Sequence, residues 1–267
     1  MIRIGTSGFS YKDWEGPFYP PGLPARDRLT YYAREFDTVE VDASYYAIPK
    51  ASTLAAMASR TPAGFRFCLK AFRGMTHERV DNAALFGQFI AALTPWIEQD
   101  RLGCVLAQFP ASFRNTPGNR DYLRLLRERM GTIPTVVEFR HRDWITRATG
   151  DLLRSLGLGF CCVDQPRLAG LVPPVAAATS TIGYVRFHGR NAAKWWRHDH
   201  AWERYDYAYP PEELAPWIPR IRRLAAATET TFVYANNHWA GQAIDTARQL
   251  RRLLGLDAPP PPPSSAG

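Results

Sequence analysis

Short apolar segments with the composition of β-strands alternate with amphipathic helical segments along almost the whole chain. The strand-like segments are rich in β-branched and aromatic residues, whereas the helical segments repeat apolar residues at intervals of three and four positions. Eight strands are expected, at residues 2–6, 38–42, 65–70, 103–108, 134–139, 159–164, 181–190 and 231–236. Eight strand–helix units in about 255 residues match the size of a TIM-type barrel. The sequence therefore predicts an α/β protein folded as a single (β/α)8 barrel.

The predicted barrel covers residues 1–256 and contains one irregular stretch. After the sixth strand, residues 165–180 are rich in Pro and Ala and show no helical face, so the alternation is interrupted there. Residues 257–267 include five consecutive prolines and are expected to form a disordered tail. An open doubly wound sheet is the alternative fold. No G-x-G-x-x-G or P-loop pattern opens a helix after a predicted strand, which favours the barrel.

The composition is that of an ordinary globular protein. The chain has 267 residues, 46% of them hydrophobic. No apolar run approaches about eighteen residues and no signal-peptide pattern is present, so a soluble cytoplasmic protein without membrane contact is expected. Cysteines 68, 104, 161 and 162 lie in predicted strands without metal-binding spacing. They are predicted to be buried thiols.

The formal net charge of +8 is consistent with an anionic partner, either a phosphorylated small molecule or nucleic acid. Four of the 33 basic residues are lysines, at positions 12, 50, 70 and 194, and each stands at the end of a predicted strand or after it. This puts the lysines on the side of the barrel where the strands end. An amine cannot be replaced by a guanidinium where it acts as an acid, a base or a phosphate ligand.

Polar side chains stand at the end of every predicted strand, after an apolar stem. Barrel enzymes place their active sites at this face. In the seventh strand, Tyr184, Arg186 and His188 share one face because side chains alternate along a strand. We therefore predict a polar pocket at the carboxyl ends of the strands. The candidate catalytic residues are Glu40, Lys70, Glu138, Asp164 and His188.

Aromatic and basic residues crowd the segments that follow the strands, above all in residues 190–205. Aromatic rings stack on sugars or bases, and Arg and Lys side chains hold phosphate groups. The candidate substrate-binding residues are Tyr11, Trp14, Tyr46, Gln108, Arg140, Arg186, Arg190, Lys194, Asn236 and Asn237.

A divalent metal ion is a further alternative, and no pattern assigns another cofactor or an oligomeric state. Mixed oxygen and nitrogen ligands that suit Zn²⁺ or Mn²⁺ end four successive strands, at Glu138, Asp164, His188 and Asn236. Against a metal, the chain has six histidines and no H-E-x-x-H pattern.

Several motifs combine glycine, aromatic and polar residues. They are Gly5-Thr-Ser-Gly-Phe-Ser-Tyr11 with Trp14 and Phe18-Tyr-Pro20, Phe36-Asp-Thr-Val-Glu40 with Tyr45-Tyr46, Gln108-Phe-Pro110, Val137-Glu-Phe-Arg140 with Trp144, Val163-Asp164, Tyr184-Val-Arg-Phe-His-Gly-Arg190 and Asn236-Asn237. With these motifs the chain resembles the YecE-like family, domain of unknown function family seventy-two. The resemblance implies a TIM-type barrel, comparable with endonuclease-IV-like and sugar-isomerase-like barrels, and no established activity. The chain departs from those metal-dependent barrels at Asn236, where a carboxylate would be expected, which argues against a borrowed metallonuclease mechanism.

Three functions are compatible with these features. The first is an enzyme that hydrolyses a phosphodiester or isomerises a sugar on a phosphorylated, sugar-containing substrate. Glu40 or Glu138 would be its general base, and His188 or Lys70 its acid or electrophile. The second is a non-catalytic nucleic-acid or nucleotide binder that uses the loop at 190–205, with salt-dependent affinity. The third is a Schiff-base lyase that acts through Lys70.

Overall fold

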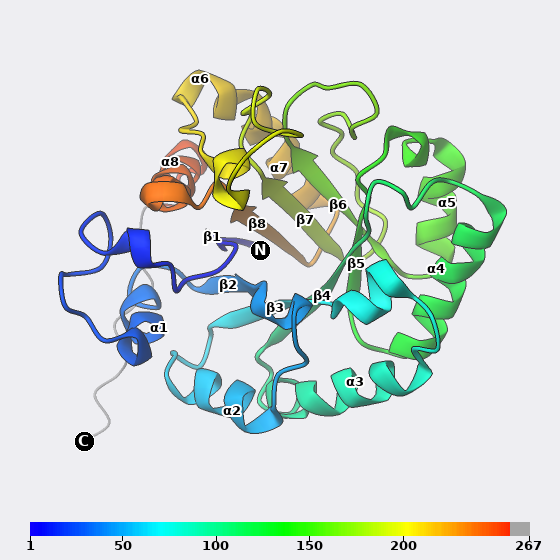
Figure 1. The fold of residues 1–267 in the computed structure, drawn as a ribbon, viewed down its shortest axis with the longest axis horizontal. Coiled ribbons are helices and arrows are strands. Elements are labelled where there is room, and N and C mark those ends of the chain that lie inside the picture. The colour runs from blue at the N-terminus through cyan, green and yellow to red at the C-terminus, as the bar shows by residue number, and fades with distance from the viewer. Residues whose placement is uncertain (257–267) are drawn as a thin grey trace.

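The computed structural model describes residues 1–256. Eight parallel strands form one sheet in the order β1-β8-β7-β6-β5-β4-β3-β2, with helices around it (Figure 1). A parallel bridge between Ser7 and Glu40 joins the two edge strands and closes the barrel. The prediction of a single (β/α)8 barrel is therefore confirmed. The strands are β1 (Ile2–Thr6), β2 (Thr38–Val41), β3 (Arg66–Lys70), β4 (Leu102–Gln108), β5 (Thr135–Glu138), β6 (Gly159–Asp164), β7 (Ile182–Phe187) and β8 (Thr230–Ala235).

The α-helices are α1 (Arg28–Tyr32), α2 (Ala51–Ser59), α3 (Ala83–Glu98), α4 (Pro117–Met130), α5 (Arg147–Ser155), α6 (Pro211–Leu214), α7 (Ile218–Ala226) and α8 (Gln242–Leu254). The described connection between β6 and β7 contains no helix, as the Pro- and Ala-rich composition of this stretch predicted. The predicted disordered tail, 257–267, lies outside the described residues. Within residues 1–256, no helix combines the length and the apolarity that a bilayer crossing requires.

Alternation along the strands divides the core into a barrel interior and a layer beneath the helices. In β3, Phe67 faces outward and stacks on Trp96 of α3, with ring centroids 4.3 Å apart. The next residue, Cys68, faces inward, and its Sγ lies 3.5 Å from Sγ of Cys104. Burying one side chain such as Phe67 contributes about 1.5–3 kcal/mol. All four cysteines are buried free thiols, as predicted.

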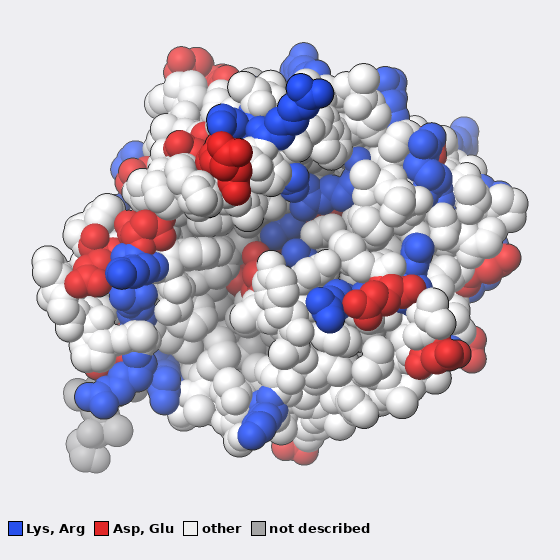
Figure 2. Space-filling model, viewed as in Figure 1, with Lys and Arg blue, Asp and Glu red and all other residues white. Residues whose placement is uncertain are grey.

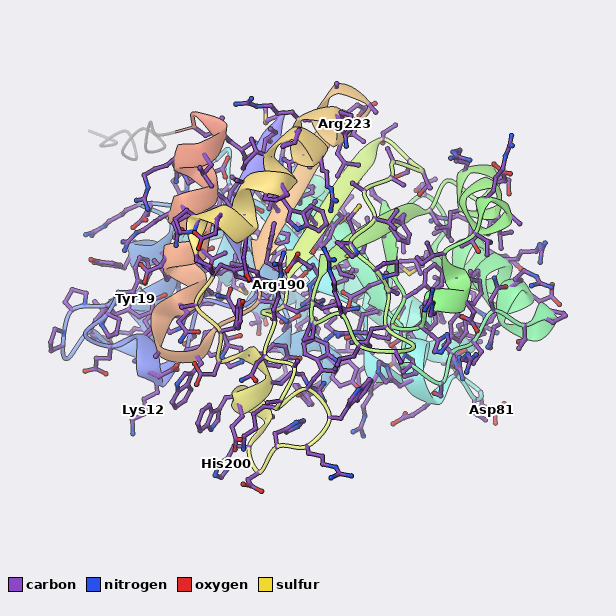
Figure 3. All side chains as sticks on the ribbon, turned by 90° about the horizontal axis from the view of Figure 1, so that it is seen from above. Lys12, Tyr19, Asp81, Arg190, His200 and Arg223 are labelled. Atoms are coloured by element: carbon purple, nitrogen blue, oxygen red, sulfur yellow. The ribbon has the colours of Figure 1, made fainter. Side chains whose placement is uncertain are left out.

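Long connections frame the mouth of the barrel. The β1–α1 connection contains the 3-10 helices η1 (Lys12–Trp14) and η2 (Ala25–Asp27), and the β7–α6 connection contains η6 (Ala201–Tyr205). Trp14 is fully buried and donates its Nε1–H to the carbonyl of His238 at 2.7 Å, which ties the first connection to the last. In Figure 3 the loop that carries His200 projects from the body of the protein, with Arg190 near its base. These connections therefore wall the space above the strand ends.

Candidate functional site

A cavity of about 1210 Å³ opens at the carboxyl ends of the strands. Figure 2 shows it as a hollow at the centre of the face, with basic and acidic atoms inside it. The aromatic side chains that line the cavity are Phe9, Tyr11, Tyr45, Tyr46, Trp195, Trp196, Trp202 and Tyr205. The polar side chains that line it from the strand ends are Asp42, Lys70, Gln108, Arg140, Arg186 and Asn236. An apolar wall with a few convergent polar groups is the usual make-up of a small-molecule site.

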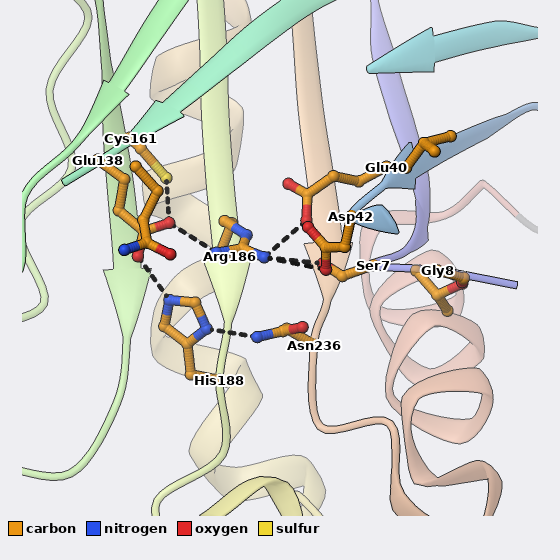
Figure 4. Close-up of polar contacts among 12 residues, drawn as sticks. Ser7, Gly8, Glu40, Asp42, Glu138, Cys161, Arg186, His188 and Asn236 are labelled. Carbon is orange, nitrogen blue, oxygen red and sulfur yellow. Dashed lines mark hydrogen bonds and ion pairs between the residues drawn. The ribbon is translucent and has the colours of Figure 1, made fainter. Parts of the chain in front are cut away.

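Ion pairs are buried beneath this cavity (Figure 4). Arg186 on β7 is 1% exposed and donates Nη1–H to Glu138 Oε2 at 2.7 Å and Nη2–H to Glu40 Oε1 at 2.6 Å. Both carboxylates are fully buried. Oδ2 of Asp42 lies 3.7 Å from the same guanidinium, and the Tyr184 hydroxyl donates to Glu40 Oε2 at 2.6 Å. Since one cation cannot neutralise three carboxylates, this layer needs further positive charge.

A chain of contacts leads from Glu138 back up to the cavity. Nε of Arg140 lies 2.9 Å from Glu138 Oε1, and Nε2 of His188 lies 3.2 Å from the same oxygen. Nδ1 of His188 is 2.9 Å from Nδ2 of Asn236 (Figure 4). The amide nitrogen of Asn236 only donates hydrogen bonds, so it favours the imidazole tautomer with its proton on Nε2, on the side of the Glu138 carboxylate. Nδ1 then accepts from the Asn236 amide, which leaves Oδ1 of Asn236 as an acceptor for the cavity.

Glu138 and His188 are held in fixed protonation states. Burial alone would raise the pKa of Glu138, but Arg140, Arg186 and His188 together hold it well below its usual range. Burial lowers the pKa of His188 to about 4, and the nearby Glu138 carboxylate only partly opposes this. At neutral pH the pair is therefore an anion beside a neutral imidazole. Neither residue is among those that line the cavity, so both are connected to it through residues that do, such as Arg140 and Asn236.

Glu40 behaves differently from Glu138. The pKa of Glu40 is raised from 4.5 to about 7, mainly by burial; Arg186 opposes this shift, and the neighbouring Asp42 adds to it. Glu40 pairs with one guanidinium, whereas Glu138 pairs with two. Glu40 therefore takes up a proton near neutral pH, whereas Glu138 stays ionised.

Glu40→Gln should alter how stability depends on pH. The native state holds a proton on Glu40 that the unfolded state releases near pH 4.5, so this stabilisation is complete below 4.5 and is lost as pH rises through about 7. Glutamine cannot ionise. The free energy of unfolding of the wild type, relative to the variant, should fall by roughly 3 kcal/mol over this range. Denaturant unfolding at several pH values measures this. The exposed control Glu128→Gln should give a flat difference, and a flat difference for Glu40→Gln would contradict the assignment.

Most of the residues predicted from the sequence gather at or beneath the cavity. Those that line it are Tyr11, Tyr46, Lys70, Gln108, Arg140, Arg186 and Asn236. Those that lie beneath it, within the ion-pair layer, are Glu40, Glu138 and His188.

Asp164 and Arg190 lie elsewhere, between the sheet and the helices. Cys161 faces the barrel interior, where its Sγ approaches Glu138, so Asp164 three positions later faces outward. Both oxygens of Asp164 accept from Arg190, at 2.8 and 2.7 Å. The same carboxylate accepts from the Tyr209 hydroxyl and from Trp217 Nε1, each at 2.7 Å. This network anchors the β7–α6 connection, and the catalytic role expected for Asp164 finds no support in it.

Three other candidates are also separated from the cavity. Asn237 faces outward and donates to a threonine hydroxyl of α8 at 2.9 Å. Trp14 is fully buried as packing. Lys194 pairs with Glu203 at 2.6 Å on the outer surface. All four lysines are within the described residues, and Lys70 is the one that lines the cavity. The lysines were expected to lie together at the mouth of the barrel, and the other three do not line the cavity.

The structure adds residues that were not selected from the sequence. Asp42 lines the cavity with its side chain 26% exposed, while its Oδ1 is buried and has no hydrogen-bond partner among the described residues. The sequence could have identified Asp42 by its position two residues after Glu40, because residues two apart in a strand point to the same face. The ring of His238 stacks on Tyr11, with centroids 4.5 Å apart and 3° between planes. No local pattern predicts a contact between residues so far apart in the chain.

The four residues considered as metal ligands do not converge. Asp164 faces outward, and Glu138 is engaged by Arg140 and Arg186. Across residues 1–256, no three His, Cys, Asp or Glu side chains lie together in a metal-binding arrangement. The residues present therefore do not fit a metal centre of the expected composition.

Comparisons with known proteins agree with this architecture. The family model described as "Protein of unknown function DUF72" matches residues 3–266. The UPF0759 protein YunF of Bacillus subtilis is 35% identical over 273 aligned positions, which cover 96% of each chain. A solved DUF72 family protein from Thermotoga maritima shares 37% identity with a TM-score of 0.88, over 96% of this chain and 99% of that one. Another from Enterococcus faecalis shares 27% identity with a TM-score of 0.86, over 98% and 99%. The chain is therefore a member of the DUF72 family, with the TIM-type barrel of its solved relatives.

Proposed function

We propose that this protein is an enzyme that acts by general acid–base chemistry on a phosphorylated, sugar-containing molecule bound in the cavity. Phosphodiester hydrolysis and sugar isomerisation are the reaction classes. One observation carries the proposal: a single aromatic-walled cavity is lined by the cations Lys70 and Arg140 together with the carboxylate of Asp42, whose side chain is 26% exposed. Cations bind phosphate, aromatic faces pack on rings, and a carboxylate within reach of a ligand accepts a proton from a hydroxyl group.

The contacts favour Asp42 over the carboxylates chosen from the sequence. A general base must come within about 2.6–3.2 Å of the proton that it removes. Glu40 and Glu138 are fully buried and bonded to Arg186, so a ligand in the cavity does not reach them. Asp42 lines the cavity, and Lys70 at the end of the neighbouring strand supplies positive charge to the same cavity.

A ligand panel tests the proposal. Sugar phosphates, nucleotides and phosphodiesters are each compared with their unphosphorylated analogues, by thermal shift for binding and by NMR for turnover. We expect at least one phosphorylated compound to raise Tm and to be converted, while its analogue does neither. Equal stabilisation by both members of every pair, or stabilisation by none, would contradict the proposal.

The loop at 190–205 supplies the alternative of a nucleic-acid or nucleotide binder. Within this loop Lys194 is paired with Glu203, and the Trp202 ring stacks on Trp239 with centroids 3.7 Å apart. A phosphate-binding groove needs exposed, unpaired cations. These contacts favour a cover over the cavity. A titration with a single-stranded oligonucleotide at two salt concentrations distinguishes the two functions, and a steep loss of affinity with salt would favour the nucleic-acid alternative.

A Schiff-base lyase would use Lys70 as its nucleophile. The ammonium group of Lys70 lies 4.8 Å from the ring centroid of Tyr45, a cation–π contact that favours an ionic role. Borohydride trapping with a panel of carbonyl compounds separates these roles. We expect no covalent label on Lys70, and a labelled Lys70 would favour the lyase.

A further inference from the structure

Two of the cations that line the cavity, Lys70 and Arg140, lie on one arc of its rim. Lys70, Gln108 and Arg140 stand at the ends of the neighbouring strands β3, β4 and β5, and all three line the cavity. Asp42 and Asn236 follow β2 and β8, on the adjoining arc. A ligand that spans both arcs meets positive charge on the first and hydrogen-bond acceptors on the second.

Within residues 1–256, Lys70 differs from Arg140 in having no carboxylate partner. Among the described residues, no carboxylate pairs with the Lys70 ammonium, which lies over the ring of Tyr45. The His77 ring meets the edge of the same tyrosine, with centroids 4.9 Å apart. Nδ1 of His77 lies 2.9 Å from Thr76 Oγ1, which leaves Nε2 for a ligand. Burial, together with the charges of Lys70 and Arg140, lowers the pKa of His77 to about 4.

The usual phosphate site of such barrels is filled by protein groups here. TIM-type barrels frequently bind phosphate at the loops after strands seven and eight. In this protein Arg190 is bonded to Asp164 and lies 3.3 Å from Glu213. The Gly189 amide donates to the Tyr209 hydroxyl at 3.0 Å. Because these donor groups already bond to protein acceptors, a phosphate group is expected at other residues of the cavity.

We propose that Lys70, His77 and Arg140 form the phosphate subsite of the cavity. The inference rests on the proposed function for the class of ligand. Nε of Arg140 faces Glu138 and Nη2 donates to Gln108 Oε1 at 3.5 Å, so Nη1 is the donor for phosphate, together with the Lys70 ammonium. The hydroxyl groups of the same ligand then lie toward Asp42. This assignment replaces Arg186 and Arg190, whose guanidinium groups are already bonded to carboxylates.

Inorganic phosphate is the probe for this subsite. Its dissociation constant is measured by calorimetry and by ³¹P NMR for the wild type, Lys70→Gln, Lys70→Arg and the exposed control Lys12→Gln. We expect millimolar binding to the wild type. Lys70→Gln should weaken it at least tenfold, because it removes a charge-assisted hydrogen bond, and Lys70→Arg should retain most of it. Lys12→Gln should match the wild type. Circular dichroism checks folding, which Lys70→Gln should preserve because it breaks no ion pair.

The outcomes separate this inference from the proposed function. Phosphate binding that requires Lys70, in a protein that converts no phosphorylated compound, would support the subsite and count against the enzyme. Conversion of a phosphorylated compound with an unchanged KM in Lys70→Gln would support the enzyme and overturn the subsite. Absence of phosphate binding to the wild type, or equal binding to wild type and Lys70→Gln, would also overturn the subsite.

Discussion

Replacing Arg186 by methionine should lower the free energy of unfolding by about 3–5 kcal/mol, because a buried charge pair loses one partner. Arg186 is 1% exposed and bonds Glu40 at 2.6 Å and Glu138 at 2.7 Å. Methionine fills a similar volume without the charge, so the two buried carboxylates lose their shared cation. Glu138 keeps Arg140, whereas Glu40 keeps no guanidinium. Denaturant unfolding measures the loss.

Two further variants separate this mechanism from a simple packing defect. Adding Glu40→Gln to Arg186→Met removes the stranded carboxylate and should recover part of the loss, roughly 1–2 kcal/mol. Arg154→Met breaks an exposed pair with Asp151, whose side chains are 55% and 61% exposed, and should change stability by less than about 0.5 kcal/mol. An Arg186→Met protein as stable as Arg154→Met would show that the buried layer carries little free energy.

The barrel was predictable because each of its elements carries its own local signal. In β7 and β8 the β-branched and aromatic residues mark the strand, and the helix at Ile218–Ala226 repeats its apolar residues at helical spacing. Eight such units leave few alternatives, since parallel strands linked by helices must be covered on both faces. The break after β6 was visible for the same reason, because its Pro- and Ala-rich sequence has no helical face.

The inner and outer faces of the strands were harder to predict. All six residues of β6, Gly159–Asp164, are buried, because a barrel strand is covered on both sides. Polarity therefore does not alternate along β6, and nothing local shows that Asp164 faces the helices. Asn236 and Asn237 are adjacent and point to opposite faces, so one lines the cavity and the other bonds α8. Counting alternate positions along the strands, from inward-facing residues such as Glu138 and Arg186, would have assigned these adjacent residues to opposite faces.

The loop residues of the site depend on tertiary contacts alone. Tyr11 lies at the cavity, where its ring stacks on His238, whereas Lys194 lies outside the cavity, where it pairs with Glu203. Residues before and after these positions carry no periodic pattern, so composition predicted an aromatic, basic mouth without saying which side chains face it.

Asp42→Asn should lower kcat by about 10²–10⁴-fold on whichever phosphorylated compound the protein converts, the usual contribution of a general acid or base. Asparagine keeps the shape and a hydrogen-bond acceptor but cannot take up a proton. Asp42 Oδ1 has no hydrogen-bond partner among the described residues, so the substitution breaks no bond of that oxygen, and its Oδ2 is already 3.7 Å from Arg186. We therefore expect KM and Tm to change little while kcat falls.

The control for this experiment is Asp199→Asn, an exposed carboxylate in the β7–α6 connection that does not line the cavity. It should leave kcat unchanged, which separates the loss of a base from the loss of negative charge near the mouth.

Glu138→Gln gives the opposite pattern to Asp42→Asn. It leaves Arg140 and Arg186 without their shared carboxylate, so Tm should fall. The fall in kcat should be limited to what the loss of ordered structure in the cavity accounts for. If Glu138→Gln abolished turnover at unchanged Tm while Asp42→Asn stayed active, the base would be the buried carboxylate, and a ligand would have to reach beneath Arg186.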